Sequence, residues 1–320
     1  MMQTIGNSSI EITPVAMGCW PIAGMTSIDV NDEDSLRTLQ EAYQSGINFF
    51  DTAYCYGANG QSEKLICRAL SRYRDQIAIA TKCGIHWNEQ GVRQINGRPE
   101  KIKQEFSESL QRLQTGVVEL LYHHAPDPDV PVVESAAAFR EILDSGRAKT
   151  IGVSNYSVSQ MNEFATVCPI SAVQPHYNML QREIEGELLP WVQTRGISVM
   201  CYWPLMKGLL AGHLPRDHQF DPRDGRRKYP MFQGEEWQKN QDFMDELRAI
   251  ALDIEKTVSQ IVINWTIHRP GITSALCGAK RPAQIKESAG GMGWKLDAQQ
   301  LQSIDAAIRS RGPIVSASAV

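Results

Sequence analysis

Residues 118–154 read VELLYHHAPDPDVPVVESAAAFREILDSGRAKTIGVS, and this stretch predicts one strand–helix–strand unit. Two short apolar runs, VELLYHH from Val118 and TIGVSN from Thr150, have the length and composition of strands. Between them apolar residues recur at helical spacing, and Gly146 suits the end of that helix. Two apolar strands joined by an amphipathic helix are typical of a parallel sheet. The apolar face of the helix is formed by Val132, Ala136, Phe139 and Leu143.

The same alternation continues along the chain in both directions. Eight strand–helix units in series predict an α/β fold whose parallel sheet closes into a (β/α)8 TIM barrel. The alternative, an open doubly wound sheet, normally binds a dinucleotide through GxGxxG, and the sequence contains no such motif. The predicted strands are VAMGC from Val15, NFFDTA from Asn48, IAIATK from Ile77, VELLYHH from Val118, TIGVSN from Thr150, SAVQPHY from Ser171, SVMCYWP from Ser198 and TSALCGA from Thr273.

Two segments fall outside this repeat. The opening TIGNSSIEI predicts a β-hairpin around Gly6–Asn7, which we expect to cap the bottom of the barrel. Residues 208–236 form a polar stretch containing Pro, Gly and Arg after the seventh strand. Long loops inside compact domains usually have a function, so this one is a candidate lid or cofactor clasp. Because there is no linker and no low-complexity tract, we expect residues 1–320 to form a single domain.

The composition narrows the class of protein. Of the 320 residues, 42% are hydrophobic and 21% are charged, as in globular proteins. The net charge of −4 gives no basic surface, so we expect no nucleic acid and no membrane as partner. The opening MMQTIGNSSIEIT lacks the layout of a signal peptide, and the seven scattered cysteines contain no CxxC pair. We therefore expect a cytoplasmic protein with reduced thiols and no metal site.

Polar side chains gather where the predicted strands end. The second strand runs into Asp51, with Tyr54 and Tyr56 just beyond it, the third ends at Lys82, and the fourth ends at His123–His124. Each of these residues alone is ordinary, since such groups often cap strands or pair within a core. Barrel enzymes, however, place their chemistry at the carboxyl ends of the strands. An acid, a phenol, an amine and an imidazole on one rim therefore predict an active site.

Seven motifs extend this pattern, and together they make the chain resemble the aldo-keto reductases over almost its full length, from Gly18 to Ser288. Any one of them is weak, but all seven in the family's order are specific. They are FDTAYCYGANGQSE (50–63), TKCG (81–84), HAPDP (124–128), GRAKTIGVSNYS (146–157), VQPHYNML (173–180), YWPLMKGLLAG (202–212) and GAKRPAQIKES (278–288).

The resemblance implies a catalytic role for four residues. Tyr56 would give a proton to the carbonyl oxygen of the substrate, Lys82 would lower the pKa of Tyr56, and Asp51 would pair with Lys82. His124, which precedes APDP as the family's active-site histidine does, would orient the carbonyl group. Neighbouring strand residues point in opposite directions, so we expect His123 to face away from the site, either packed or solvated.

The resemblance also implies NADPH as cofactor, because Lys280 and Arg281 fall where the family meets the 2′-phosphate. Ser154, Asn155 and Gln174 would bind the carboxamide, and the nicotinamide ring would stack on Tyr202. The loop along the pyrophosphate would be Leu205, Lys207, Gly208, Leu209 and Leu210. The adenosine end would lie on Gly278, Lys280, Arg281, Gln284, Glu287 and Ser288, and further cofactor contacts would come from Gly18, Cys19, Trp20, Trp203 and Pro204.

The substrate pocket is expected to be open. Ala125 stands where many relatives have Trp, and the stretch after Pro313 is shorter than the family's usual carboxy-terminal loop. The pocket would be lined by Trp20, Tyr56, Trp87 and His124.

The expected reaction is reduction of an aldehyde or ketone, a small-molecule substrate, by hydride from NADPH and a proton from Tyr56. One alternative is a sugar or polyol dehydrogenase that uses NAD or NADP in the same site. The other is a nucleotide-binding regulatory module resembling the β subunits of potassium channels.

Overall fold

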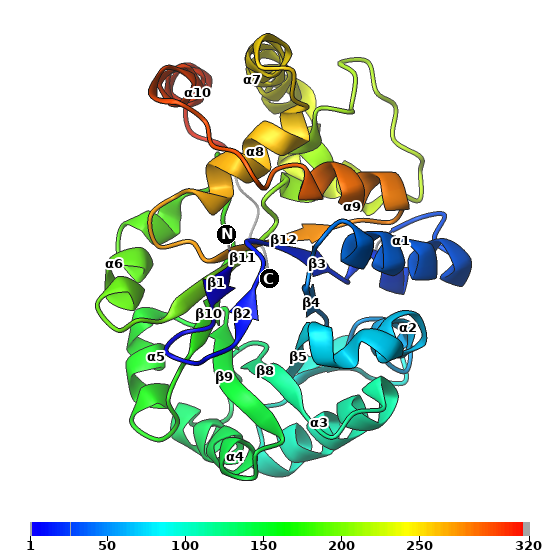
Figure 1. The fold of residues 1–320 in the computed structure, drawn as a ribbon, viewed down its shortest axis with the longest axis vertical. Helices are drawn as coiled ribbons and strands as arrows, with labels where there is room; N and C mark the ends of the chain where they lie inside the picture. The colour runs from blue at the N-terminus through cyan, green and yellow to red at the C-terminus, as the bar shows by residue number, and fades with distance from the viewer. Residues whose placement is uncertain (1, 26, 316–320) are drawn as a thin grey trace.

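The computed structural model describes residues 2–25 and 27–315, and eight parallel strands in it close into a barrel (Figure 1). The order of the strands around the barrel is their order in the chain, which confirms the predicted (β/α)8 fold. All eight predicted strands are present. They are β3 (Val15–Gly18), β4 (Phe49–Asp51), β5 (Ala78–Cys83), β8 (Val118–His123), β9 (Ala148–Ser154), β10 (Ala172–Gln174), β11 (Ser198–Tyr202) and β12 (Ser274–Gly278).

Helices form a ring around the strands, as Figure 1 shows. Their apolar faces pack on the outward side chains of the barrel in one continuous core. None of the helices in residues 2–25 and 27–315 has the length and apolar character needed to cross a bilayer. The ring consists of α1 (Asp32–Gln44), α2 (Gln61–Leu70), α3 (Pro99–Leu113), α4 (Val132–Asp144), α5 (Val158–Ala165), α6 (Leu188–Gln193), α8 (Val258–Ile267) and α9 (Pro282–Ala289).

Two further helices, α7 (Gly234–Asp253) and α10 (Ala298–Arg311), pack on each other outside α8 (Figure 1). Buried Arg311 joins them, because its guanidinium pairs with Glu236 and donates to Asn240 Oδ1. The predicted loop at 208–236 is shorter than expected, since α7 already begins at Gly234. Short 3₁₀ helices occupy part of the connections: η1 (Pro21–Ala23), η2 (Ser71–Gln76), η3 (Glu183–Glu185), η4 (Met206–Ala211), η5 (Gly225–Lys228) and η6 (Pro230–Phe232).

The inside of the barrel is filled by side chains from the strands, because every second residue of a strand points inward. A Cβ on Gly152 would meet the ring of Tyr122 at 2.4 Å, so the glycine in β9 makes room for the largest of these side chains. The inward residues are Ala16, Phe49, Ala78, Ala80, Leu120, Tyr122, Ala172, Met200 and Leu276. The barrel is therefore a packed core, and space for a ligand exists only at its rim.

The predicted amino-terminal hairpin is present as β1 (Gln3–Thr4) and β2 (Glu11–Ile12), and it closes the end of the barrel opposite the strands' carboxyl ends (Figure 1). Ile5 and Ile12 are fully buried among the inward side chains. The N–H of Gly6 donates to Ser198 Oγ at 2.8 Å, and that hydroxyl donates to the carbonyl of Thr4 at 2.9 Å. These contacts confirm the hairpin as the cap of the barrel.

Replacing Ile12 by alanine should lower the free energy of unfolding by about 2–5 kcal/mol, because the change leaves a cavity beneath the barrel core. Glu11→Ala, on the neighbouring exposed side chain, is the matched control and should change the value by less than about 0.5 kcal/mol. Urea unfolding followed by circular dichroism measures both. Equal effects of the two substitutions would show that the hairpin is not part of the core.

Candidate active site

The rim of the barrel carries one inward position from each strand, two residues beyond the last inward core residue. Because side chains alternate along a strand, these positions follow directly from the core positions. They are Gly18, Asp51, Lys82, His124, Ser154, Gln174, Tyr202 and Gly278. All eight belong to the residues that the sequence predicts for the site, so the fold collects them from eight separate strands at one end of the barrel.

Lys82 lies at the centre of this rim and is fully buried. Its ammonium group donates to Asp51 Oδ1 at 2.6 Å, to the carbonyl of Thr52 at 2.8 Å and to the hydroxyl of Tyr56 at 3.2 Å. All three donors of the ammonium group are thus satisfied. The second carboxylate oxygen of Asp51 accepts a hydrogen bond from Gln174 Nε2 at 2.8 Å. The buried ion pair is therefore held from three sides, and the phenol of Tyr56 is attached to it.

The pKa of Tyr56 lies well above its ordinary value, because burial disfavours the phenolate and the carboxylate of Asp51 repels it. This direction is the net effect of the surroundings, so the lowering of the pKa by Lys82 stays a prediction. Lys82 is itself paired with Asp51, so the phenol faces an ion pair and not an isolated cation. Tyr56 keeps its proton at neutral pH, which suits a group that has to donate one.

The two histidines of the fourth strand lie on opposite sides, as the alternation predicts. His124 lies beside the site, with its ring centroid 5.9 Å from that of Tyr56 and its Nδ1 3.6 Å from Cys55 Sγ. Burial and the nearby charge of Lys82 hold the pKa of His124 well below its ordinary value, so the ring is neutral. His123 is buried between the barrel and the helices, where Nδ1 lies 2.6 Å from the hydroxyl of Tyr156.

Aromatic side chains surround the phenol on its open side. The ring of Trp20 meets that of Tyr56 edge-on, with 4.9 Å between the centroids. Trp87 comes from a hairpin after β5 that the sequence reasoning missed, formed by β6 (Ile85–Trp87) and β7 (Arg93–Ile95). The indole N–H of Trp87 donates to the carbonyl of Cys55 at 2.7 Å. The structure thus places all four residues of the predicted substrate pocket together.

The carboxy-terminal stretch is described only as far as Val315, whose N–H donates to Glu236 at 3.4 Å. Ile314 packs against the main core. The expectation that the stretch after Pro313 leaves the pocket open therefore falls partly outside the described residues, because it includes residues 316–320.

The residues expected to bind a carboxamide form a connected network at the ends of β9, β10 and β11. Tyr202 donates from its hydroxyl to Asn155 Oδ1 at 2.9 Å, and Asn155 Nδ2 donates to the carbonyl of His124 at 3.0 Å. Ser154 donates to the carbonyl of Gln174 at 2.8 Å. Asn155 has φ +60°, an unusual conformation that turns its side chain toward this network.

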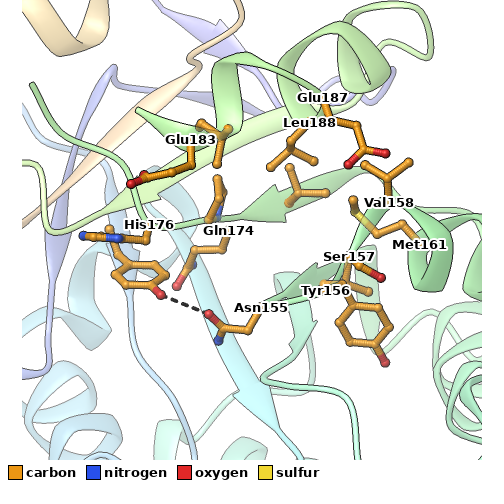
Figure 2. A pocket seen from close by; sticks show the side chains of 15 residues that line it. Asn155, Tyr156, Ser157, Val158, Met161, Gln174, His176, Glu183, Glu187 and Leu188 are labelled. Carbon is orange, nitrogen blue, oxygen red and sulfur yellow. Dashed lines mark hydrogen bonds between the residues drawn. The ribbon is translucent and has the colours of Figure 1, made fainter. Parts of the chain in front are cut away.

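A cavity of about 370 Å³ opens beside this network. Figure 2 shows Asn155, Gln174 and His176 at its base and Glu183 and Glu187 at its outer edge. Tyr202 also lines the cavity, whereas Tyr56 and Lys82 do not. Three of the four residues expected around the nicotinamide therefore share one opening, which lies beside Tyr56 and Lys82 but is not lined by them.

A group of cations lies beyond the end of β11. Lys207 has no carboxylate partner among residues 2–25 and 27–315, and burial together with Lys228 and Arg226 lowers its pKa to about 8. Arg226 contacts the carbonyl of Lys207 at 3.5 Å and is oriented by an ion pair with Asp224 at 2.7 Å. Burial and Arg226 also lower the pKa of Lys280. Positive charges held together in this way favour an anion such as a phosphate group.

Sequence reasoning missed Arg226, although it singled out the loop that carries it. The available signal was the basic run RRK at 226–228. Nothing in the sequence indicates that this run returns to Lys207 and Lys280.

Most of the residues expected at the adenosine end are engaged with the protein itself. Lys280 Nζ donates to the carbonyl of Ile28 at 3.3 Å, and Arg281 donates to the carbonyl of Asp29 at 2.7 Å and pairs with Asp34 at 3.3 Å. Both cations thus hold the loop after β3.

The other residues expected at the adenosine end also contact the protein itself. Gln284 Oε1 accepts from the N–H groups of Lys280 and Arg281, Ser288 Oγ donates to the carbonyl of Gln284, and Glu287 pairs with His213. Four of the other expected cofactor residues are buried and could contact a ligand only through their backbone atoms: Cys19, Pro204, Leu209 and Leu210. Trp203 and Leu205 are partly exposed. Gly208 and Lys207 both have positive φ, which exposes the backbone of this turn.

No three His, Cys, Asp or Glu side chains come together as metal ligands in the part of the chain that the structure describes. The chemical groups at the rim are therefore a protonated phenol, a buried ion pair and a neutral imidazole, with an anion-attracting group of cations alongside.

Comparison with known proteins assigns the chain and its fold to one family. The family model described as "Aldo/keto reductase family" matches residues 14–309. The aldo-keto reductase YhdN of Bacillus subtilis is 34% identical over 306 residues, which cover 94% of this chain and 92% of that protein. The NADH-specific methylglyoxal reductase of Escherichia coli is 31% identical over 299 residues, 89% of this chain and 91% of that protein.

A solved structure agrees with these sequence matches. The glycerol dehydrogenase of Gluconobacter oxydans superposes with a TM-score of 0.91 at 31% identity, covering all of this chain and 98% of that one.

Breaking the buried ion pair should cost stability. Lys82→Met leaves a buried carboxylate without its partner and should lower the free energy of unfolding by about 3–5 kcal/mol. The double variant Lys82→Met, Asp51→Asn should lose less than the sum of the two single variants, with a coupling of at least about 1 kcal/mol. The exposed pair Arg140–Asp144 is the matched control and should couple by only about 0.3–0.5 kcal/mol. Additive effects at Lys82 and Asp51 would contradict the pairing.

Proposed function

The chain belongs to the aldo/keto reductase family, and we propose that it reduces an aldehyde or ketone to the alcohol with NADPH, with Tyr56 as the proton donor. Members of this family are oxidoreductases that act on carbonyl groups with nicotinamide cofactors. The observation that carries the proposal is the hydrogen bond of 3.2 Å between Lys82 and the hydroxyl of Tyr56, at a rim where Asp51 fixes the lysine.

The proposed proton transfer starts from the protonated phenol of Tyr56. A substrate carbonyl oxygen beside Tyr56 would accept the proton of its hydroxyl as negative charge develops on that oxygen. The phenolate left behind would lie 3.2 Å from the ammonium group of Lys82, which stabilises it. His124 is neutral and therefore able to donate a hydrogen bond to the same carbonyl oxygen without repelling Lys82.

The residues around the rim fit a nicotinamide dinucleotide, which supplies a hydride to the carbonyl carbon when bound. Asn155, Gln174 and Tyr202 line one cavity next to the catalytic rim. Lys207 and Arg226 form a positive group beside Gly208, where a backbone without a Cβ allows close approach to phosphate oxygens. One end of the site would therefore hold the amide of the cofactor, and the other its phosphates.

The preference for NADPH rests on the cations at the end of β12. The charges of Arg226 and Arg281 both act on Lys280, so Arg226 would add a third positive charge near a 2′-phosphate. The pairing of Arg281 with Asp34 weakens this preference, because the carboxylate competes with a phosphate. One relative at 31% identity is described as NADH-specific, so the family resemblance alone does not choose between the two nucleotides.

A dehydrogenase working in the opposite direction is the second candidate, favoured by the likeness to a glycerol dehydrogenase at 31% identity. The same phenol would then take part in removing the hydroxyl proton. A nucleotide-binding module resembling potassium-channel β subunits would keep the same four residues without needing turnover. Assays with a panel of aldehydes, ketones, sugars and polyols and with both nucleotides distinguish the three candidates, because only the module shows no turnover with any of them.

Tyr56→Phe keeps the ring and removes the proton. Carbonyl reduction should fall by at least about a hundredfold, whereas nucleotide affinity should stay close to that of the wild type. Single-turnover rates and nucleotide binding followed by fluorescence measure the two properties. Tyr54→Phe is the matched control, because the hydroxyl of Tyr54 donates to Glu108 and not to the ion pair. Near-normal reduction by the Tyr56 variant would assign the proton to another group.

The cofactor preference is tested by the dissociation constants of NADPH and NADH. Wild type should bind NADPH at least about tenfold more tightly, because one charge-assisted contact contributes roughly 1.5–3 kcal/mol. The double variant Lys280→Ala, Arg281→Ala should lose this preference while its affinity for NADH hardly changes.

Lys286→Ala, which removes an exposed lysine of α9 that pairs with Glu41 of α1, is the control and should leave both constants unchanged. Equal affinities in the wild type would remove the assignment of NADPH and favour the dehydrogenase with NAD.

A further inference from the structure

The chain bends sharply at Gly84, immediately after β5. Gly84 has φ +96°, and a Cβ at this position would meet the ring of His123 at 2.7 Å. No other residue fits here, so the bend is fixed by packing as well as by backbone conformation. On one side of it, two residues away, lies Lys82, and on the other side begins the hairpin β6–β7 that carries Trp87.

Both backbone polar groups of Gly84 are bonded across this bend. Its carbonyl accepts from the N–H of Asn96 at 2.9 Å, which closes the base of the hairpin. Its N–H donates to Glu105 Oε2 at 2.7 Å. Glu105 belongs to α3 and is fully buried. Its carboxyl group therefore links a helix of the outer ring to the base of the hairpin.

Few groups compensate this burial. His86 Nδ1 lies 3.0 Å from Glu105 Oε1, although the two atoms lack hydrogen-bonding geometry, and Lys101 Nζ lies 3.9 Å from the same oxygen. The ammonium group of Lys101, at the outer limit of an ion pair, offsets only part of the cost of burying this carboxyl group, so an apolar residue would be the simpler choice for the helix alone. Glu105 instead supplies a hydrogen-bond acceptor for the N–H of Gly84.

We propose that Glu105 is a positioning residue for the active site, which holds the Gly84 bend and thereby fixes the hairpin that presents Trp87 to the substrate. Trp87 is tied in turn to the carbonyl of Cys55, next to Tyr56. The support therefore acts on the substrate side of the phenol and leaves the pair of Lys82 and Asp51 intact. This inference rests on the proposed function only in taking Trp87 as part of the substrate pocket.

The charges around Glu105 make this support sensitive to pH. Burial raises its pKa to about 7 and outweighs the hydrogen bond from the N–H of Gly84, which lowers the pKa. Glu108 acts in the same direction as burial, and Lys101 and Arg112 act against it. Burial and Lys101 lower the pKa of His86, the group that faces the carboxyl from β6. His123 and Cys83, which lie on the far side of the bend, are uncharged because burial lowers the pKa of the imidazole and raises that of the thiol.

The sign of the dependence follows from linkage. The closed bend favours the protonated carboxyl, whose pKa is about 7, over the exposed one near 4.5. The stabilisation is complete below pH 4.5 and is lost as the pH rises through 7. Opening of the hairpin should therefore become more frequent between about pH 4.5 and pH 7, by up to about tenfold per pH unit, and should level off above pH 7, where both states are ionised. Glu105→Gln should abolish this dependence, since the amide keeps an acceptor for Gly84 and does not ionise.

Two measurements test the proposal. The first is hydrogen exchange of residues 84–96 between pH 5 and pH 8, corrected for the intrinsic exchange rate, in wild type and Glu105→Gln. Protection should fall from pH 5 to about pH 7 in the wild type and level off above pH 7, and it should stay flat in the variant. Glu100→Gln, on an exposed carboxylate of the same helix, is the control and should behave as the wild type. The same pH profile in wild type and Glu105→Gln would overturn the proposal.

The second measurement is the steady-state kinetics of carbonyl reduction. Glu105→Leu should raise KM by about tenfold or more, as expected for an unsatisfied N–H at Gly84, with kcat within about threefold of wild type. Glu105→Gln should keep KM within about twofold at pH 6. An unchanged KM in the leucine variant, or a fall in kcat alone, would contradict the positioning role.

The two tests also separate the positioning role from the proposed reaction. Circular dichroism checks that the leucine variant is folded, and the exchange comparison does not depend on that variant. If wild type reduces no carbonyl compound, the proposed function fails, while hydrogen exchange still decides whether Glu105 holds the bend.

Discussion

The site depends on one constraint, the alternation of side chains along strands that close into a barrel. Inside the barrel every second residue is an apolar core residue, and the next inward position on each strand is at the rim. Asp51, Lys82 and His124 occupy these positions because Phe49, Ala80 and Tyr122 fill the layer beneath them. A shift of one residue in any strand would exchange its rim side chain for an outward one. His123, one residue before His124, points outward and is buried among the helices.

The second organising feature is the neutral ion pair beneath the phenol. Two charges buried together cost less than one, and the hydrogen bonds from Gln174 to Asp51 and from Lys82 to Thr52 reduce the cost further. The arrangement has a chemical consequence. It leaves Tyr56 fully protonated in the resting protein and places a cation where negative charge appears once the proton has left. The lysine therefore acts on the phenolate more than on the phenol.

Sequence patterns predicted the eight strands, the capping hairpin and Asp51, Lys82 and His124 at the strand ends, because each depends on neighbours in the chain. The other rim residues came from the resemblance to the aldo-keto reductases. The hairpin β6–β7 was missed because its two strands have three residues each, too few to show a period. The helix α7 was partly missed because residues 234–236 read as the end of a polar loop, although Trp237, Phe243 and Leu247 bury one face of it. In each case the packing of distant segments outweighed a weak local signal.

The sequence by itself determined the barrel, the order of its strands and the side chains that reach its rim, since strand period and helix period are local properties. The tertiary structure alone decided which distant groups meet. It brought Arg226 to Lys207 and Lys280, paired Arg281 with Asp34, and placed the carboxyl group of Glu105 under Gly84. The physical reason is that the strength of an electrostatic contact depends on separation and burial in space. Neither quantity is present in the sequence until the barrel has closed.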